Sequence, residues 1–458
     1  MADRPVVLVH GYSDQGRSFE SWRRALTQAG RDIRLVQVGT YVSLSNEITI
    51  KDIAEGFDRA LSDCAGLSRG EEFDAIVHST GMLVVREWLS CANGTVDEPD
   101  LATHRQRRLK RLIGLAPATW GSPIAHKGRS WLGAIFKGNT TFGPDFMEAG
   151  DQVLAALELG SSYTWALAER DFLGTEAVYS KGASTPYPFI FVGLSDYGWL
   201  KRVVTEPGTD GTVRWAGVGF NSRKVSIDLT VDGTRRNRVR LEPWKNVTVP
   251  LIFLEGLNHG SILSDPNDLL QQMVLEALDV SSGTAYSEWT AKHTPRSDAA
   301  LKKQGAVRYQ QFIVRAVDER GDGIDDFFIE IGTVTGTNFQ PLPFDLDVHA
   351  YRDDRSYRCF HVDLDQLTVK PDALAIRVIA ESGTELVAYQ GYDSSGGTLI
   401  RPHEEGKWDA IIEFDRAVNK KGFEFFFPFT TTLVELRMNR EPMPLHGRNN
   451  VFWFGERP

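Results

Sequence analysis

The stretch "DAIVHSTGMLVVREWL" (74–89) passes from strand-like into helix-like sequence with only the polar "HSTG" (78–81) between them. A serine on such a tight strand-to-helix turn exposes its hydroxyl, provided that the residues two positions away are small. Gly81 meets this requirement, whereas Val77 stands where the usual pattern has a second glycine. The stretch therefore predicts either a nucleophile elbow at Ser79 or a plain strand end followed by a helix that Ser79 caps.

The surrounding sequence alternates between apolar strand-like runs and helical patterns up to about residue 280. The runs are continuous in their apolar residues, which is typical of strands buried on both faces of a parallel sheet. They are "PVVLVH" (5–10), "IRLVQVG" (33–39), "FDAIVHS" (73–79), "LKRLIGLAP" (109–117), "PFIFVGLS" (188–195) and "VPLIFLEG" (249–256). With helical candidates between them, these runs predict an α/β domain over residues 1–282, with a mostly parallel sheet and helices on both faces. A long insertion at about 118–187 interrupts the alternation, as lids do.

The pattern changes beyond this domain. Residues 283–307 are polar and rich in small side chains, which favours a linker. From 308 to 458, short β-like runs are separated by turn signals, with almost no helical pattern between them. This second region is predicted to be an all-β sandwich.

The composition of the 458 residues limits the classes of partner. A formal net charge of −10 argues against nucleic acid as a partner. The chain has no apolar window long enough to span a bilayer, although peripheral contact with lipid is compatible with it. The three scattered cysteines and an N-terminus without the layout of a signal peptide lead us to expect a cytoplasmic protein. Secretion without a cleavable signal would leave the same sequence.

Candidates for the partners of Ser79 follow other predicted strands. A serine hydroxyl becomes a good nucleophile when a base takes its proton and an acid orients that base. His259, in "FLEGLNHGSIL" (253–263), follows the last predicted strand and is the candidate base. Two carboxylates qualify as the acid, Asp210 in a glycine-rich turn and Asp196 directly after a strand, and local sequence leaves both open.

The first strand ends at His10-Gly11, which suggests an oxyanion hole. Such a site needs fixed donors where negative charge develops. One donor is the N–H of the residue after the serine, here Thr80, and the other comes from the loop after an earlier strand, here Tyr12.

Five segments in order resemble one family. They are "HGYSDQG" (10–16), "HSTG" (78–81), "LAPATWGSP" (115–123), "DGTV" (210–213) and "NHGSI" (258–262). Together they resemble the α/β-hydrolase superfamily, and more narrowly the lipases and acyltransferases related to lecithin–cholesterol acyltransferase and some bacterial lipases. Over roughly residues 1–280, the resemblance implies an α/β-hydrolase fold with a catalytic triad of Ser79, Asp210 and His259. It favours Asp210 over Asp196, because the acid of these enzymes lies in the "DGTV"-like turn.

The insertion contains "SWLGAIFKG" (130–138), whose Trp131, Leu132, Ile135 and Phe136 have helix-compatible spacing. This pattern indicates either a helix that packs on the core or a lid over an acyl pocket. From all these features we expect a carboxylic ester hydrolase of the lipase or esterase kind that works through an acyl-enzyme. Its substrate would be a small-molecule or lipid ester, without a metal or organic cofactor, and its oligomeric state is left open. The alternatives are a phospholipase or acyltransferase, and a non-catalytic protein that binds partners on a hydrolase scaffold.

Overall fold

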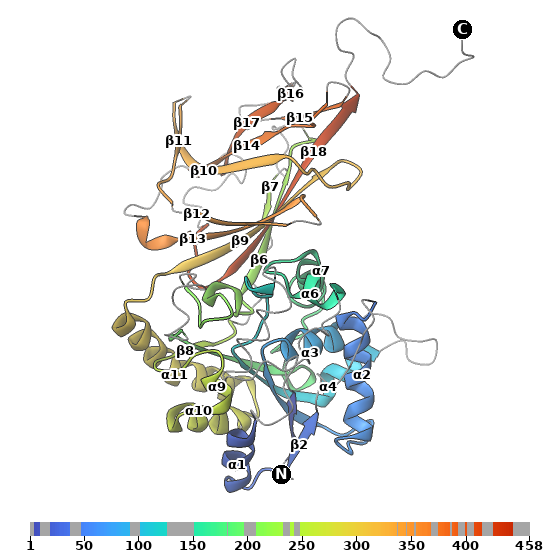
Figure 1. Cartoon of the computed structure of the whole chain (residues 1–458), viewed down its shortest axis with the longest axis vertical. Helices are drawn as coiled ribbons and strands as arrows, with labels where there is room; N and C mark the ends of the chain where they lie inside the picture. The colour runs from blue at the N-terminus through green and yellow to red at the C-terminus, as the bar shows by residue number, and fades with distance from the viewer. Residues whose placement is uncertain are drawn as a thin grey trace, which may run out of the picture. The chain divides into compact units, whose positions relative to one another are not determined.

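The computed structural model describes most of the chain, which divides into two compact units (Figure 1). The described residues are 4–9, 19–36, 47–91, 101–125, 151–180, 182–196, 208–231, 239–241, 248–336, 338–344, 346–351, 354–367, 374–384, 387–392, 399–400, 407–414 and 425–442. The first unit is Met1–Ser222 with Trp244–Val307, and the second is Arg223–Pro243 with Arg308–Pro458.

The first unit is built on a six-stranded parallel sheet. Its strands, in spatial order, are β2 (Ile33–Val36), β1 (Val6–Val9), β3 (Phe73–His78), β4 (Leu109–Leu115), β5 (Tyr187–Gly193) and β8 (Leu251–Leu254). Every residue of β1, β3 and β5 is buried, as expected for strands that are covered on both faces.

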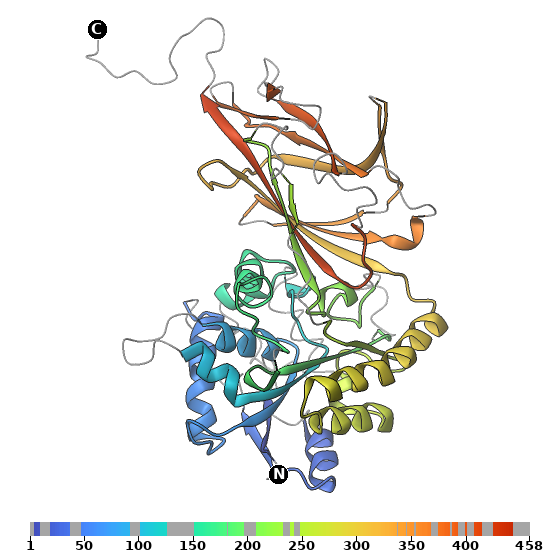
Figure 2. The same cartoon turned by 180° about the vertical axis from the view of Figure 1, so that it is seen from behind.

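Helices cover both faces of this sheet (Figures 1 and 2). They are α1 (Glu20–Gln28), α2 (Ile50–Asp63), α3 (Gly81–Ser90), α4 (Leu101–Arg108), α6 (Asp151–Leu157), α7 (Ser162–Asp171), α9 (Ser261–Ser264), α10 (Asp268–Leu278) and α11 (Gly283–Gln304). Side chains of α1, α10 and α11 share one apolar cluster with the strands. On the other face, Trp88 of α3 packs edge-on against Phe57 of α2, with ring centroids 5.4 Å apart. The predicted α/β domain with helices on both faces is therefore confirmed.

The segment predicted to be a linker differs from that expectation, because Gly283–Gln304 forms the 22-residue helix α11. The side chain of Ser282 caps its N-terminus, and Gly305 ends it in the left-handed conformation that glycine favours. Its buried positions recur every three or four residues, at Tyr286, Trp289, His293, Ser297 and Ala300. Only the first two are large and apolar, so the helical period is carried partly by polar residues and is hard to recognise in the sequence.

The described residues of the second unit form two β-sheets. One has the order β11 (Asn338–Pro341), β10 (Phe327–Thr335), β14 (Leu374–Ala380) and β17 (Trp408–Glu413). The other has the order β12 (Leu346–Ala350), β13 (Tyr357–Asp363), β9 (Tyr309–Asp318), β18 (Thr431–Pro442), β15 (Val387–Tyr392) and β16 (Leu399–Ile400). Beside it, β6 (Ser222–Asp228) pairs with β18 and with β7 (Val239–Leu241). The expected region of β-strands is confirmed.

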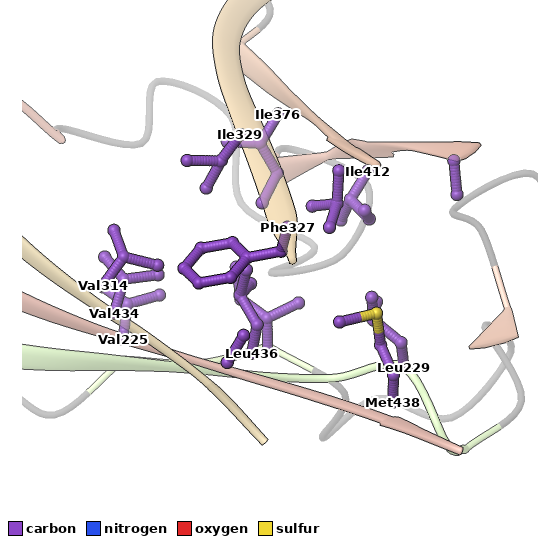
Figure 3. Close-up of a cluster of buried hydrophobic side chains, with 14 of the residues drawn as sticks. Val225, Leu229, Val314, Phe327, Ile329, Ile376, Ile412, Val434, Leu436 and Met438 are labelled. Atoms are coloured by element: carbon purple, nitrogen blue, oxygen red, sulfur yellow. The ribbon is translucent and has the colours of Figure 1, made fainter. Parts of the chain in front are cut away.

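An apolar core lies between these two sheets. Figure 3 shows Ile329, Ile376 and Ile412 of the smaller sheet facing Val314 and Leu436 of the larger one. The β6–β7 pair contributes Val225 and Val239 to this core, although it lies within the range predicted for the first domain. A strand pair that leaves one domain to join another sheet carries no local sequence signal, because its alternation fits either domain. Within the described ranges, no helix has the length and apolar character that a membrane span requires.

Candidate active site

Ser79 lies in a strained turn between β3 and α3. Only Ser79 and Thr80 separate the end of β3 at His78 from the start of α3 at Gly81. The φ angle of Ser79 is +53°, in the left-handed region that costs a non-glycine residue about 1–2 kcal/mol. The Ser79 amide donates to the Leu115 carbonyl (3.3 Å), and its carbonyl accepts from the amides of Met82 (3.2 Å) and Ala118 (3.1 Å). The turn thus has the conformation that a nucleophile elbow requires.

The neighbour of Val77 on β4 is a glycine. Val77 pairs in register with Gly114, so the two residues point to the same face of the sheet. A Cβ atom on Gly114 would meet the Met82 Cε atom at 2.7 Å, which shows how tightly α3 approaches β4. The side chains of Met82, Ile190 and Pro117 fill the space beside Gly114.

The imidazole of His259 connects Ser79 to a carboxylate. Its Nε2 atom lies 3.1 Å from the Ser79 Oγ atom, and its Nδ1 atom lies 3.0 Å from the Asp210 Oδ2 atom. With Nδ1–H donated to the carboxylate, a neutral imidazole leaves Nε2 as the acceptor for the serine hydroxyl. The exposed fractions of Ser79, His259 and Asp210 are 2%, 0% and 0%. Ser79, His259 and Asp210, which lie far apart in the sequence, therefore form one buried hydrogen-bonded chain.

Asp210 is fixed by its own turn. Its Oδ1 atom accepts hydrogen bonds from the amides of Thr212 (3.0 Å) and Val213 (2.9 Å), which leaves Oδ2 for His259. Gly211 adopts a φ of +99°, which permits this tight turn. The other predicted acid, Asp196, follows β5 and is only partly buried. The geometry around His259 thus favours the choice of Asp210 that the family resemblance implied.

The backbone of His259 is held as firmly as its side chain. Its amide donates to the Asp210 carbonyl at 3.1 Å, and its carbonyl accepts from the His78 Nε2–H at 2.9 Å. The loop also packs closely on the end of β5, because a Cβ atom on Gly193 would lie 2.1 Å from the Leu257 carbonyl oxygen. His78 was not singled out in the sequence, although a polar residue inside a buried strand was the available signal.

The segment after β4 braces the turn of Ser79 against the turn of Asp210. Beside the Ala118 bond to Ser79, the Ser122 hydroxyl donates to the Thr212 carbonyl at 2.6 Å. The Thr119 hydroxyl donates to the Val218 carbonyl, also at 2.6 Å. This segment was predicted from its family resemblance alone, and its hydrogen bonds connect the turns of the candidate site residues.

A buried ion pair supports this segment from the side of α3. Arg86 and Asp171 both have fully buried side chains, and their bidentate contacts measure 2.8 and 3.0 Å. The remaining Arg86 nitrogen, Nη1, donates to the Thr119 carbonyl at 2.6 Å. Burial opposes the charge, but Asp171 outweighs it and raises the pKa of the Arg86 guanidinium above its ordinary value. Because unpaired buried charges are costly, the pair ties α3, α7 and the segment after β4 into one arrangement.

The predicted oxyanion donors are described only in part. Thr80 is the N-cap of α3, and within the described residues its amide donates to no protein acceptor. That amide is therefore open to a ligand, as first-turn amides of helices are. Tyr12 lies outside the described residues, as do the lid candidates Trp131, Leu132, Ile135 and Phe136.

The parallel sheet with helices on both faces corresponds to the α/β-hydrolase fold. No family model and no curated protein matches the sequence. Among solved structures, phospholipase PlaB from Legionella pneumophila is similar, with 24% sequence identity, a TM-score of 0.74, and coverage of 96% of this chain and 94% of that one. The structure of PlaB in complex with thio-NAD gives 23% identity, the same coverage and a TM-score of 0.73. The expected α/β-hydrolase fold, followed by a β-rich unit, is confirmed.

Proposed function

We propose that this protein is a serine hydrolase that cleaves carboxylic esters of lipids. The observation that carries the proposal is the chain of hydrogen bonds from Ser79 through His259 to Asp210, with Ser79 on a strained turn. Strain at a non-glycine residue persists when the surrounding structure holds it in place, and such residues cluster at functional sites. A strand end that merely caps a helix does not require a histidine and a carboxylate behind it.

The first half of the reaction forms an acyl-enzyme. The Ser79 Oγ atom attacks the acyl carbonyl while the His259 Nε2 atom takes the hydroxyl proton. Asp210, whose Oδ2 atom lies 3.0 Å from His259 Nδ1, stabilises the imidazolium that forms. The Thr80 amide donates to the oxyanion of the tetrahedral intermediate, with Tyr12 as the proposed second donor. Collapse of the intermediate breaks the ester bond, and His259 returns the proton to the leaving alcohol.

The second half releases the acid. Water attacks the acyl carbonyl and gives a proton to His259, which then passes it to the Ser79 oxygen as the carboxylic acid departs. All three side chains are buried, so an ester reaches Ser79 only after whatever covers the site moves aside. Residues 130–138 remain our proposed lid.

Phospholipids are the second candidate substrate class within this chemistry. The likeness to a phospholipase covers 96% of this chain and therefore includes the β-rich unit as well as the α/β unit. This likeness supports the proposal that the ester belongs to a phospholipid. A glycerophospholipid would then lose a fatty acid in the two steps described above.

The decisive experiment measures hydrolysis of p-nitrophenyl esters from short to long acyl chains, and of phosphatidylcholine and lysophosphatidylcholine. The wild type is compared with Ser79→Ala, Asp210→Ala and Asp196→Ala. We expect the first two variants to lose several orders of magnitude in kcat, whereas Asp196→Ala stays near wild type. If Asp196→Ala is the inactive one, the chemistry stands with a different acid. Full activity of Ser79→Ala would overturn the proposal.

Two further outcomes distinguish the rival functions. A non-catalytic scaffold would fail to react with a fluorophosphonate probe, whereas an activated Ser79 is labelled covalently and Ser79→Ala is not. An acyltransferase would transfer the acyl group to an added alcohol or lysophospholipid faster than to water, which product analysis detects.

A further inference from the structure

An open surface cavity of about 500 Å³, lined largely by basic residues, lies at the end of the first unit's sheet that is remote from Ser79. Its charged or titratable lining residues are Glu72, His104, Arg107, Arg108 and Lys110. These residues precede β3 or lie at the end of α4 and the start of β4. Ser79 follows the carboxyl end of β3, a strand of six residues that spans roughly 20 Å. The cavity is thus separate from the candidate active site.

The charge of the cavity is not balanced by its own residues. Arg107, Arg108 and Lys110 are cations, and Glu72 is the single carboxylate among the lining residues. The negative end of α4 offsets only about half an elementary charge. At least one positive charge therefore remains in excess, in a protein whose overall net charge is −10.

Two of the cations are held in place by backbone carbonyls. The Arg108 side chain is nearly buried, and its Nε and Nη2 atoms donate to the carbonyls of Glu71 (3.3 Å) and Ser68 (3.2 Å). The Lys110 ammonium donates to the Ala183 carbonyl at 2.9 Å and lies 3.0 Å from a Glu72 carboxylate oxygen. Groups fixed in this way lose little conformational entropy when a ligand binds.

Other donors in the cavity are still available. Within the described residues, the Nη1 atom of Arg108 makes no hydrogen bond, and the exposed Arg107 has no ion-pair partner. Burial lowers the pKa of the Arg108 guanidinium from its ordinary value, and the nearby Arg105 and Arg69 act in the same direction against Asp58 and Glu71. A bound anion would favour the charged form of this buried guanidinium.

We propose that this cavity binds a phosphate group. The Arg107 guanidinium can match two phosphate oxygens, and Arg108 can add its remaining Nη1 donor. A dianion also balances the excess positive charge better than a carboxylate does. Lys110 adds a point charge, and His104 adds a ring nitrogen at the wall. The volume is large enough for the group to be carried by a small phosphate ester or by the head of an anionic phospholipid. The inference does not depend on the ester hydrolase proposal, since it uses none of the residues around Ser79.

The test measures pyrophosphate binding by calorimetry at constant ionic strength, using the full chain. Arg107→Gln removes a cavity charge from an exposed position and should leave the fold intact. Arg59→Gln is the matched control, because it removes an exposed arginine from α2 outside the cavity lining. We expect the Kd of the wild type to rise about tenfold in Arg107→Gln and to stay unchanged in Arg59→Gln. Equal weakening in both variants would show non-specific screening and overturn the proposal.

A second arm separates the two sources of phosphate. Flotation with phosphatidylcholine vesicles, with and without diether phosphatidylglycerol that has no ester to cleave, tests a lipid headgroup. Binding that requires phosphatidylglycerol and is lost in Arg107→Gln supports a membrane source, whereas pyrophosphate binding alone supports a soluble ligand. If neither pyrophosphate nor the anionic vesicles bind in an Arg107-dependent manner, the cavity is not a phosphate site.

Discussion

Two histidines of the first unit, His259 and His293, have similar surroundings. Each side chain is fully buried, and each has a ring nitrogen near a carboxylate oxygen, at 3.0 Å from Asp210 and 2.8 Å from Glu276. Each also lies beside another aromatic ring, at 4.8 Å between ring centroids for His78 and 4.6 Å for Trp289. Burial and a carboxylate partner therefore do not by themselves define a catalytic histidine.

The difference lies at the second nitrogen of each ring. His259 Nε2 meets the Ser79 hydroxyl at 3.1 Å. His293 Nδ1 has no hydrogen-bond partner in the part of the chain that the structure describes. His259 sits in a loop whose backbone is held from two sides, whereas His293 sits inside the regular helix α11. The comparison indicates that contact with a hydroxyl in a strained turn distinguishes the candidate catalytic residue His259 from His293, which packs in the core.

The largest expected effect comes from exchanging the two histidines one at a time for glutamine. His259→Gln should lower kcat for p-nitrophenyl esters by about 10⁴-fold or more, because no base remains to take the Ser79 proton. His293→Gln should leave kcat within about twofold, since its ring contacts no part of the hydrogen-bonded chain around Ser79. Circular dichroism of both variants confirms that they fold. An equal loss of activity in the two would break the distinction.

The next effect concerns the two carboxylates. Asp210→Asn should reduce kcat by about 10³- to 10⁴-fold, because the amide no longer stabilises the imidazolium and favours the wrong tautomer. Glu276→Gln makes the same chemical change beside His293 and should leave kcat near that of the wild type. Steady-state kinetics of the two variants provide the measurement. A strong loss in Glu276→Gln would mean that the two histidine sites are coupled.

Ser79 and His259 could be predicted as candidates because each lies just beyond a recognisable apolar strand, whereas Asp210 was a candidate because it lies in a glycine-rich turn. Parallel strands bring their carboxyl ends to one edge, so residues far apart in the chain become neighbours there. The choice between Asp210 and Asp196 was different, because both occupy plausible turns and only the family resemblance separated them. The distance from Asp210 to His259 depends on how three loops fold against one another.

Other features depend on contacts that have no local pattern. The helix α11 was mistaken for a linker because His293 and Ser297 occupy buried positions that apolar residues usually fill. The bond from His78 to the His259 carbonyl joins residues 181 positions apart. The β6–β7 pair joins a distant sheet by backbone hydrogen bonds, which hardly depend on side-chain identity.

A smaller effect on kcat is expected from two buried serines, Ser122 near Asp210 and Ser297 on the same helix as His293. Ser122 donates its hydroxyl to the Thr212 carbonyl beside Asp210, and Ser297 on α11 accepts the Phe253 amide at 2.9 Å. Ser122→Ala should lower kcat roughly tenfold with KM unchanged, because the turn of Asp210 loses its anchor and the acid shifts. Ser297→Ala should cost similar stability and no activity. If both serines affect only the melting temperature, the segment after β4 does not position the acid.

The smallest expected effect is on stability, and it arises from the protonation of His293. Burial, the largest cause, lowers the pKa of His293 below its ordinary value of 6.5, and Lys292 and Arg296 add to this against the opposing effect of Glu276. Below about pH 6.5 the unfolded chain therefore binds a proton that the folded chain resists, and acidification reduces the free energy of unfolding. At neutral pH the neutral ring is fully compatible with the fold.

His293→Gln removes this titration while keeping a donor for Glu276. We expect the variant to be about 1 kcal/mol less stable at pH 7.5, because it loses the packing of the ring against Trp289. The difference in the free energy of unfolding between the two proteins should shrink as the pH falls from 7 to 5. Only the wild type has His293, whose lowered pKa makes the folded state less stable on acidification. Glu276 does not interfere with this test. Burial raises the pKa of Glu276, but hydrogen bonds from Lys292 and His293 outweigh burial and lower this pKa below its ordinary value of 4.5, so its protonation lies below the pH range of 5 to 7. Urea denaturation at several pH values measures the difference. A difference that widens on acidification would mean that His293 is protonated in the folded state, and it would then be a cation paired with Glu276 rather than a neutral packing residue.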